Sequence, residues 1–304
     1  MMSFLLAMLA AAPVEVRPEH SWKQTEHSLA LLRSGKVIWQ FNYEKEGGKP
    51  CFHPVTVAGS DALTDLRPPD HPWHRAIWFS WKFINGVNYW EENPKTGRAD
   101  GETELVEVRA MPREDHSARF EMALRYHPPE KPPVLSERRI VEVSRPAEDG
   151  KYCIDWLGTF TAADGDVLLD RTPILGEPKG VSYGGYAGLS LRLAPSLREW
   201  EFADREGPVH AAWKQAPWMS FRGPTRDGRS AAIVVLDHPA NLRHPAPWYL
   251  IQKMPYFSPA LLYRGPYTLP AGRSITLRYR ILLLPGPLNR EAVESDARRF
   301  GETK

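Results

Sequence analysis

Proline and glycine occur so often along this chain that long helices have little room. The 304 residues include 29 prolines and 22 glycines. Because proline cannot continue a helix and glycine weakens one, this spacing favours short strands joined by turns. The length is enough to bury a sizeable core, in one large all-β domain or in two ordinary ones. We find no convincing linker or internal repeat, and we predict a single domain over residues 17–304.

Apolar alternation of strand length recurs from one end of the chain to the other. The segment SLALLRSGKVIWQFNYE, residues 28–44, is typical of a hairpin that turns at Ser34-Gly35. Further strand-like runs begin at Thr103, Ala118, Arg138, Lys151, Tyr186, Ser230, Trp248 and Ser274. No alternating helical pattern lies between them, which predicts an all-β fold of large antiparallel sheets. One helix is expected at the C-terminus, capped by Asn289 and ended by Gly301.

The first residues resemble a leader. In MMSFLLAMLAAAPVEV an apolar run over residues 4–12 ends in small residues, as before a signal-peptidase site. We predict a signal peptide over residues 1–16 and a periplasmic or secreted protein. No Lys or Arg precedes the run, so a cytoplasmic chain with an uncleaved leader stays open. The run is too short to span a bilayer, which needs about 20 apolar residues.

Net charge argues against two classes of partner, and the number of cysteines argues against a structural zinc site. The formal charge is +2, with 39 basic residues against 37 acidic ones. That balance gives no electrostatic footprint for a nucleic acid or an anionic membrane, and we expect neither as a partner. Cys51 and Cys153 are too few for a structural zinc site, and they are either a disulfide of an exported chain or buried thiols. No pattern indicates an oligomeric state.

Histidine, arginine and tryptophan concentrate in RPPDHPWHRAIWFSWKFINGVNYWEE, residues 67–92. On a plain strand His71 and His74 would point to opposite faces, so they converge only if the chain turns, and residues 70–72 can supply that turn. Arg75 can position a hydroxylated ligand, and Trp78 can stack on a sugar ring. The alternative is a core strand whose two histidines make separate hydrogen bonds.

Five histidines directly precede proline, which places them on extended segments or turns and not inside helices. They are His53, His71, His127, His238 and His244. The HExxH helix of a zincin is therefore absent, and HPWH carries proline where that motif has its glutamate. We count His53 among the candidate substrate-binding residues.

A second polar cluster, DHPANLRHPAPW at residues 237–248, follows the apolar strand AAIVVL. It supplies the candidates Asp237, His238, Asn241, Arg243 and His244. The end of a strand delivers such side chains to the rim of a sheet, where loops carry function. The alternative is a polar turn whose Asp and Asn cap their own backbone. Because its residue types echo the first cluster, we expect the two clusters to face one cleft.

Three further polar residues are candidates. Asp155 lies in YCIDWLGTF, where burial would raise its pKa and suit a general acid or base, unless it is a hydrogen-bonded structural aspartate. Glu177 lies in a glycine-rich loop that lacks the spacing of a phosphate cradle. Arg222 can orient an anionic or hydroxylated ligand, or pair with an acid. No GxSxG nucleophile signature is present.

Several segments together resemble a known family. They are CFHPVTVAGSDALTDLRPPDHPWHRAIWFSWKFINGVNYWEE, GGYAGLSLR, WMSFRGP, DHPANLRHPAPW and GPYTLPAGRSITLRYRILL. They look like the bacterial proteins often labelled "PmoA family", a DUF6807-like domain of unknown function. That label implies a methane monooxygenase subunit, which we reject because such a subunit needs membrane-spanning helices. The resemblance implies instead a β-supersandwich of the galactose mutarotase type, whose concave sheet binds carbohydrate. Mutarotases use a histidine acid and a glutamate base, and Glu177 is the nearest candidate for that base.

Three functions follow from these residues. The first is an exported carbohydrate-active enzyme that uses acid/base chemistry at a glycosidic or anomeric centre, as a hydrolase, lyase or epimerase without a cofactor. Its catalytic candidates are His71, His74, Asp155, Glu177, Asp237 and His238, and its substrate-binding candidates are His53, Arg75, Trp78, Arg222, Asn241, Arg243 and His244. The second is a non-catalytic carbohydrate-binding protein that uses the same cleft. The third is a metal-dependent enzyme whose ligands are His71, His74 and either His238 or His244.

Overall fold

The computed structural model describes residues 20–45, 47–57 and 59–303, and these residues form three sheets in which the paired strands run antiparallel. The signal peptide predicted at residues 1–16 lies outside the described part. The prediction of an all-β fold with large antiparallel sheets is confirmed. Within the described residues, no helix is long and apolar enough to cross a membrane.

The first large sheet has eight strands. Their order is β1 (His20–Gln24), β2 (Ser28–Arg33), β3 (Lys36–Asn42), β4 (Cys51–Val55), β5 (Ile77–Ser80), β13 (Gly188–Arg192), β19 (Tyr256–Pro259) and β18 (Trp248–Ile251). The predicted hairpin is the pair β2 and β3, which turns at Ser34-Gly35, and both turn residues have positive φ angles.

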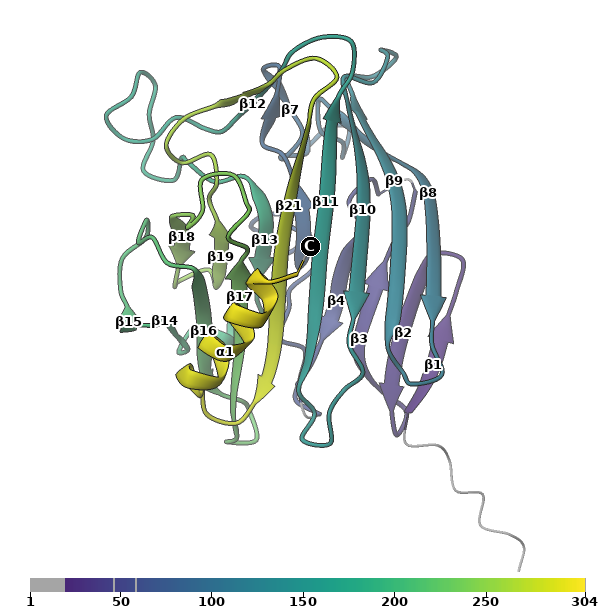
Figure 1. Cartoon of the computed structure of the whole chain (residues 1–304), viewed down its shortest axis with the longest axis vertical. Helices are drawn as coiled ribbons and strands as arrows, with labels where there is room; N and C mark the ends of the chain where they lie inside the picture. Colours follow the sequence, from purple (N-terminus) through teal and green to yellow (C-terminus); the bar gives the residue numbers. More distant parts are fainter. Residues whose placement is uncertain (1–19, 46, 58, 304) are drawn as a thin grey trace, which may run out of the picture.

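The second large sheet has nine strands. Their order is β15 (Gly207–Val209), β14 (Glu201–Asp204), β16 (Trp218–Pro224), β17 (Ser230–Asp237), β21 (Ser274–Pro285), β11 (Tyr152–Ala162), β10 (Leu135–Val143), β9 (Ala118–His127) and β8 (Glu102–Pro112). A small sheet of β20 (Tyr267–Leu269), β12 (Val167–Asp170), β6 (Phe83–Ile84) and β7 (Val87–Asn88) lies at the top of the molecule in Figure 1. A short 3-10 helix spans Pro195–Leu197.

The two large sheets lie face to face, with the nine-stranded sheet in front in Figure 1. Their inner faces meet in one apolar core, where the Phe41 ring of β3 lies 4.6 Å from the Phe120 ring of β9. On the other half of the sheet, Phe79 of β5 stacks 5.0 Å from Phe160 of β11. Strand alternation sends every second side chain into this core and leaves the others on the two outer faces.

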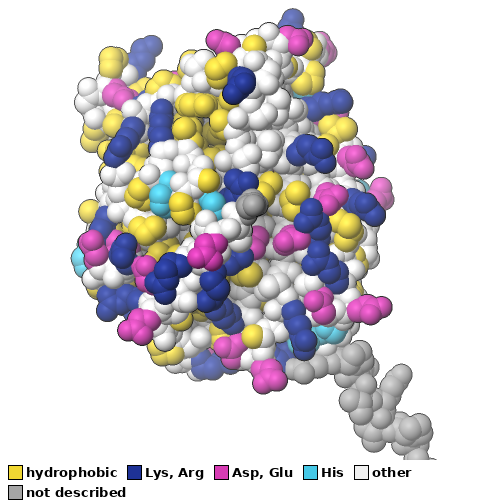
Figure 2. Space-filling view, viewed as in Figure 1, with side chains coloured by type: hydrophobic (Ala, Val, Ile, Leu, Met, Phe, Trp, Pro, Cys, Tyr) yellow, Lys and Arg dark blue, Asp and Glu magenta, His cyan; other side chains and the backbone are white. Residues whose placement is uncertain are grey.

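One α-helix, α1 (Arg290–Gly301), crosses the outer face of the nine-stranded sheet (Figure 1). The predicted cap is confirmed, because the Asn289 side chain accepts a hydrogen bond from Ala292 N. Val293 and Phe300 of α1 pack with Leu236 and other outward-facing residues of the sheet. Figure 2 shows that basic and acidic side chains are interspersed on this face of the molecule.

Both cysteines are free thiols. Cys51 of β4 faces outward from the eight-stranded sheet, where it packs in the same apolar cluster as Trp78. Cys153 of β11 packs at the edge of the cluster beneath α1, on the outer face of the other sheet. The core lies between them, so these two cysteines do not form the disulfide that the sequence left open.

Candidate functional site

The outer face of the eight-stranded sheet carries a group of histidine and aromatic side chains. We call it the histidine–aromatic cluster, and it consists of His71, His74, Trp78, Trp90, Tyr186, Tyr249 and Tyr256. Strand β5 illustrates how it is built, because Ile77 and Phe79 point into the core while Trp78 between them points out. The period of two along a strand produces this separation of faces.

The chain turns sharply just before β5, as residues 70–72 predicted. His71 N donates to Pro68 O at 3.0 Å, and His74 N donates to His71 O at 2.9 Å. The turn places the His71 and His74 rings in a stack, with centroids 4.6 Å apart and an interplanar angle of 24°. The two imidazoles therefore converge despite being three residues apart on an otherwise extended segment.

His74 is the buried centre of the cluster. Its ring stacks on Tyr256 at 5.3 Å and lies 5.2 Å from Trp78, and the residue is 3% exposed. Burial, together with the neighbouring His71 and Arg192, lowers the pKa of His74 to about 2. His74 is therefore neutral at ordinary pH and does not supply an imidazolium acid. Its buried Nδ1 has no hydrogen-bond partner among the described residues.

His71 is held by a carboxylate. Asp70 Oδ2 lies 3.1 Å from His71 Nδ1, which is an ion-pair distance although the angle is not that of a hydrogen bond. Both oxygens of Asp70 accept from Arg192 Nη2 at 2.8 Å. Partial burial alone would raise the pKa of Asp70, but the contacts with Arg192 and His71 outweigh it and lower that pKa. An ionised Asp70 beside Nδ1 leaves Nε2 as the nitrogen that can exchange a proton.

Arg75 connects this cluster with a cavity. Its guanidinium pairs with Glu92, and the same carboxylate pairs with Arg67 at 3.0 Å. Both arginines and Glu92 line a cavity of about 380 Å³, together with Lys49. Lys49 Nζ donates to the carbonyl oxygen of Trp90 at 2.8 Å, so the cavity directly adjoins the histidine–aromatic cluster.

Trp78 does not offer a face for stacking. It is 1% exposed, because His74, Trp90 and Tyr256 surround its ring. The prediction that Trp78 stacks on a sugar is therefore wrong, because a ligand cannot reach either face of its ring. The partly exposed rings at the edge of the cluster are Trp73, Tyr186, Trp213 and Tyr263.

His53 is the third residue of β4 and, by alternation, lies on the same outer sheet face as Cys51. Its Nδ1 is 2.9 Å from Thr64 Oγ1, and burial lowers its pKa, against a smaller opposing effect of Asp65. Among the described residues, no ring contact joins His53 to His71 or His74. His53 is therefore a neighbour of the site that already has a structural partner.

The second polar cluster is a self-contained turn. Asp237 accepts hydrogen bonds from Asn241 Nδ2 at 2.8 Å and Ala246 N at 2.9 Å, and it lies 3.0 Å from His244 Nδ1. Arg243 donates to three backbone carbonyls in the loop of residues 261–266. These contacts match the alternative reading of a polar turn that caps its own backbone.

The cleft that we expected between the two clusters is not formed. The His238 ring lies 5.0 Å from Phe300 of α1, on the outer side of the nine-stranded sheet. His74 lies against Tyr256 on the outer side of the eight-stranded sheet, so the whole core separates the two imidazoles. The ligand set of the metal hypothesis is therefore not assembled with His238. In the described part of the chain, no group of three or more His, Cys, Asp or Glu is placed to hold a metal ion.

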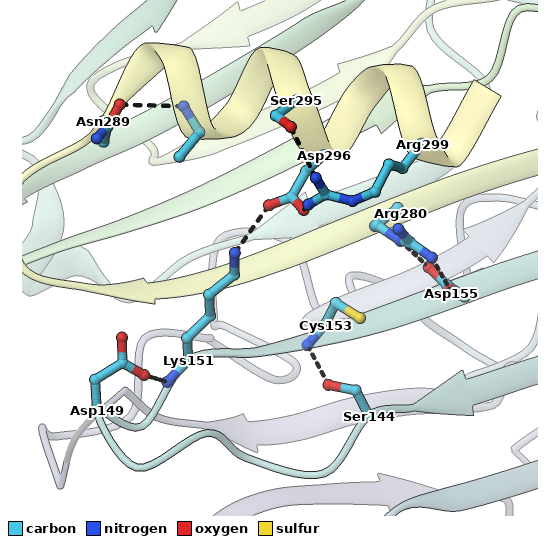
Figure 3. A network of polar contacts seen from close by, with 11 residues as sticks. Ser144, Asp149, Lys151, Cys153, Asp155, Arg280, Asn289, Ser295, Asp296 and Arg299 are labelled. Carbon is cyan, nitrogen blue, oxygen red and sulfur yellow. Dashed lines mark hydrogen bonds and ion pairs between the residues drawn. The ribbon is translucent and has the colours of Figure 1, made fainter. Parts of the chain in front are cut away.

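Asp155 is also far from the histidine–aromatic cluster. Its neighbours Ile154 and Trp156 point into the core, so alternation turns Asp155 outward beneath α1. There it accepts two hydrogen bonds from Arg280, at 2.6 and 2.7 Å (Figure 3). The expectation that its apolar neighbours bury it is wrong, because they lie on the other face of the strand.

Glu177 and Arg222 have structural partners as well. Glu177 accepts from Arg171 at 2.5 Å and from Ile174 N at 3.0 Å, and the hydrogen bond from Arg171 is the main reason why its pKa is lowered. Arg222 pairs with Glu201 at 2.5 Å on the nine-stranded sheet. In the described structure neither side chain forms a hydrogen bond or an ion pair with the histidine–aromatic cluster, and both hold their own surroundings in place.

Comparison with known proteins adds one match. A family of unknown function, DUF6807, matches residues 28–298, which is most of the chain. The chain belongs to this family. No curated protein matches it.

In this DUF6807 protein, sequence reasoning missed several residues of the site. Arg192 and Tyr256 come from strands that follow the histidine segment by more than 100 residues, and only the sheet order brings them to it. Lys49 follows a turn that carries no recognisable motif. A usable signal was Asp70, which stands directly before His71 and is a natural partner for its Nδ1.

Proposed function

We propose that this DUF6807 protein is a carbohydrate-active enzyme that transfers a proton at a glycosidic or anomeric centre, with His71 as the acid/base group. The observation that carries the proposal is the contact of His71 with Asp70, which Arg192 holds through both carboxylate oxygens. A carboxylate at this distance from Nδ1 attracts, and so stabilises, the imidazolium that forms when Nε2 accepts a proton. The His71 side chain is 33% exposed, which lets a ligand reach it.

The aromatic rings around His71 suit a sugar as the ligand. Tyr186 stacks on Tyr249 with centroids 5.0 Å apart, and Trp73 lies 5.3 Å from His71. Such rings offer apolar faces to the C–H groups of a pyranose, while hydroxyl and imidazole groups meet its hydroxyls. In this proposal Tyr186 and Trp73, which are partly exposed, take the stacking role that the sequence assigned to Trp78.

In this proposal the two histidines have different roles. His74 is a positioning residue that supports His71 by stacking, because its low pKa keeps it neutral. Asp155, Glu177 and Arg222 have no part in the proposed reaction, since each is held in an ion pair elsewhere. The products of a substrate screen distinguish a hydrolase, a lyase and an epimerase.

A non-catalytic carbohydrate-binding protein is the second candidate. Most glycosidases use two carboxylic acids on either side of the reacting bond. Here Asp70 and Glu92, which lie close to the two histidines in the fold, both pair with arginines. Because both carboxylates are already paired, neither is free to act as the second catalytic acid, which favours binding without turnover.

Two finer statements belong to the same proposal. We propose that the sandwich is a supersandwich of the galactose mutarotase type, as the "PmoA family" resemblance implies, and that the protein is exported. Two large antiparallel sheets and a candidate site on an outer sheet face support the first statement. The apolar leader in the sequence supports the second.

A substrate screen with one matched pair of variants tests the proposed activity. Purified protein is incubated with a panel of oligosaccharides and keto-sugars, and products and anomeric exchange are followed by mass spectrometry and proton NMR. His71→Gln is expected to lower kcat at least 100-fold, as for the loss of a general acid/base, with less than a fivefold change in Kd. Asp155→Asn is the control and keeps the wild-type kcat. Equal turnover by His71→Gln and the wild type contradicts the catalytic role, and binding without turnover in the wild type favours the second candidate.

A further inference from the structure

The cavity beside Arg75 is rich in basic side chains. Five basic residues line it against three acidic ones; the basic ones are Lys45, Lys49, Arg67, Arg75 and Arg98. Two of the acids lie within ion-pair distance of side chains on β9: Glu102 is 3.8 Å from His127, and Glu104 is 4.0 Å from Arg125. The third, Glu92, is shared by two arginines. The cavity therefore offers a surplus of positive charge to a ligand.

The walls of this cavity are built by close approach of backbones. Gly48 has a φ of +60°, and a Cβ atom there would collide with the carbonyl oxygen of Thr103. A Cβ atom at Gly101 would collide with the buried ring of Tyr89. Only glycine permits both contacts. The loop before β4 and the segment that enters β8 are thus held against each other, which gives the cavity a defined shape.

Glu92 shows which kind of anion the arginines accept. One of its oxygens pairs with Arg75 and the other with Arg67 at 3.0 Å, so a carboxylate spans the two guanidinium groups. Planar guanidinium groups recognise carboxylates through paired hydrogen bonds. A ligand carboxylate entering the cavity meets donors that are already arranged for that geometry.

Lys45, Lys49 and Arg98 line the cavity without an ion-pair partner among the described residues, and Lys49 is the one that is bonded to the histidine–aromatic cluster. Among the described residues, its Nζ has no carboxylate within ion-pair distance and donates only to the Trp90 carbonyl. The pKa of Lys49 is lowered to about 7, mainly by burial and also by Arg75 and Lys82, while Glu92 and Glu91 oppose the shift. A bound anion would offset the cost of keeping this ammonium group charged.

We propose that this cavity binds the carboxylate of an acidic sugar, with Lys49 as its main ionic partner and Arg67 and Arg75 as hydrogen-bond donors. The inference deepens the proposed function, on which it rests, because Arg75 follows His74 directly and Lys49 is bonded to Trp90 of the histidine–aromatic cluster. A saccharide with its ring on the cluster can therefore place a carboxylate in the cavity.

Binding of such a ligand is coupled to protonation of Lys49. With the free amine near half protonation at neutral pH, a ligand that needs the ammonium form binds more weakly as pH rises above 7. The decrease approaches tenfold per pH unit, the limit for uptake of one proton. Lys49→Arg keeps the charge at every pH in this range and is expected to remove most of the dependence.

The test compares oligogalacturonides with their methyl esters, which differ only in the charge of the carboxyl group. Titration calorimetry at pH 6.5 should show at least tenfold tighter binding of the acid form to the wild type. Lys49→Met should lose at least tenfold in affinity for the acid form and keep its affinity for the ester. Lys151→Met, which removes a lysine that pairs with Asp296 on the opposite face, is the control and should bind both forms as the wild type does.

The outcomes separate this inference from the proposed function. Equal affinity for acid and ester, or unchanged binding of the acid by Lys49→Met, overturns the carboxylate site alone. Acid-selective binding together with normal turnover by His71→Gln overturns the catalytic role alone. Failure of every saccharide to bind overturns both. Inorganic phosphate is included as a probe, and tighter binding of phosphate than of galacturonate, lost in Lys49→Met, would also overturn the assignment to a carboxylate.

Discussion

The two outer faces of the sandwich carry similar polar residues but differ in what lies beside those residues. On the face covered by α1, Arg280 donates two hydrogen bonds to Asp155, and Lys151 pairs with Asp296 at 2.8 Å (Figure 3). On the other face, the histidine–aromatic cluster adjoins a cavity that five basic side chains line.

The cavity, and not an unpaired buried atom, distinguishes the two faces. Buried polar atoms are almost always hydrogen-bonded, since leaving one unpaired costs about 1–3 kcal/mol. Within the described residues both faces depart from that rule, with an unpaired imidazole nitrogen at His74 Nδ1 on one and at His238 Nε2 on the other. On the face of the eight-stranded sheet the imidazole lies near a cavity with surplus positive charge, whereas His238 packs against Phe300 of α1. We therefore assign function to the face of the eight-stranded sheet and stability to the face that α1 covers.

The strongest test of that assignment removes the main apolar contact of α1. Phe300 is 4% exposed and packs with Leu236 and Val293 against the nine-stranded sheet. Phe300→Ala is expected to lower the free energy of unfolding by about 3 kcal/mol, as for truncation of a large buried side chain. Urea denaturation measures this loss. Saccharide affinity of the folded variant should stay at the wild-type value. A large change in affinity would contradict the assignment of function to one face and stability to the other.

The next largest effect is a dependence of stability on pH that originates at His74. The folded protein holds the pKa of His74 at about 2, whereas the unfolded chain protonates it near 6.5. The unfolded state thus binds more protons between these values, so folding loses stability as pH falls below 6.5. Between pH 6.5 and 4.5 the loss is about 2 kcal/mol for one such group. His74→Phe should show a correspondingly flatter profile in thermal melts, and parallel profiles would contradict the burial of a neutral His74.

The fold was largely predictable from the sequence because its signals are local. Alternation of apolar residues indicated the long strands such as β8, β11 and β21, and the cap at Asn289 indicated α1. Strands of two to four residues, such as β6, β7 and β15, gave no signal, since alternation needs more residues to be visible. They are positioned by their neighbours in the sheets.

The site was predictable only where its parts lie close together in sequence. The turn that stacks His71 on His74 is encoded within residues 70–74. The pairing of Asp70 with Arg192 spans 122 residues and depends on the order of strands, which no local pattern reveals. The mistaken cleft has the same origin: the first polar cluster precedes β5 and the second follows β17, and these two strands belong to different sheets.

A pair of arginine substitutions compares the two faces directly. Arg192 is 3% exposed and holds Asp70 beside His71, whereas Arg280 holds Asp155 beneath α1. Arg192→Met is expected to cost about 1.5 kcal/mol of stability, because it removes charged hydrogen bonds to a partly exposed carboxylate. It should also lower kcat about tenfold and shift the pH profile of kcat, since His71 loses its fixed partner.

Arg280→Met supplies the matched result for the other face. It removes an equivalent pair of hydrogen bonds and should cost about 1 kcal/mol or less in urea denaturation, with kcat and its pH profile unchanged. Equal effects of the two substitutions on kcat would show that the polar groups of both faces contribute alike to turnover, against the assignment made above.

The smallest expected effect concerns the end of α1. The side chain of Asn289 satisfies the backbone N–H of Ala292, one of the donors that a helix leaves unpaired in its first turn. Asn289→Ala should therefore lower the free energy of unfolding by about 1 kcal/mol, while Asn289→Asp keeps the cap and most of the stability. Thermal melts measure both. Because α1 lies on the face opposite to His71, neither variant should alter saccharide binding, and a loss of binding by Asn289→Ala but not by Asn289→Asp would mean that α1 supports the site through the core.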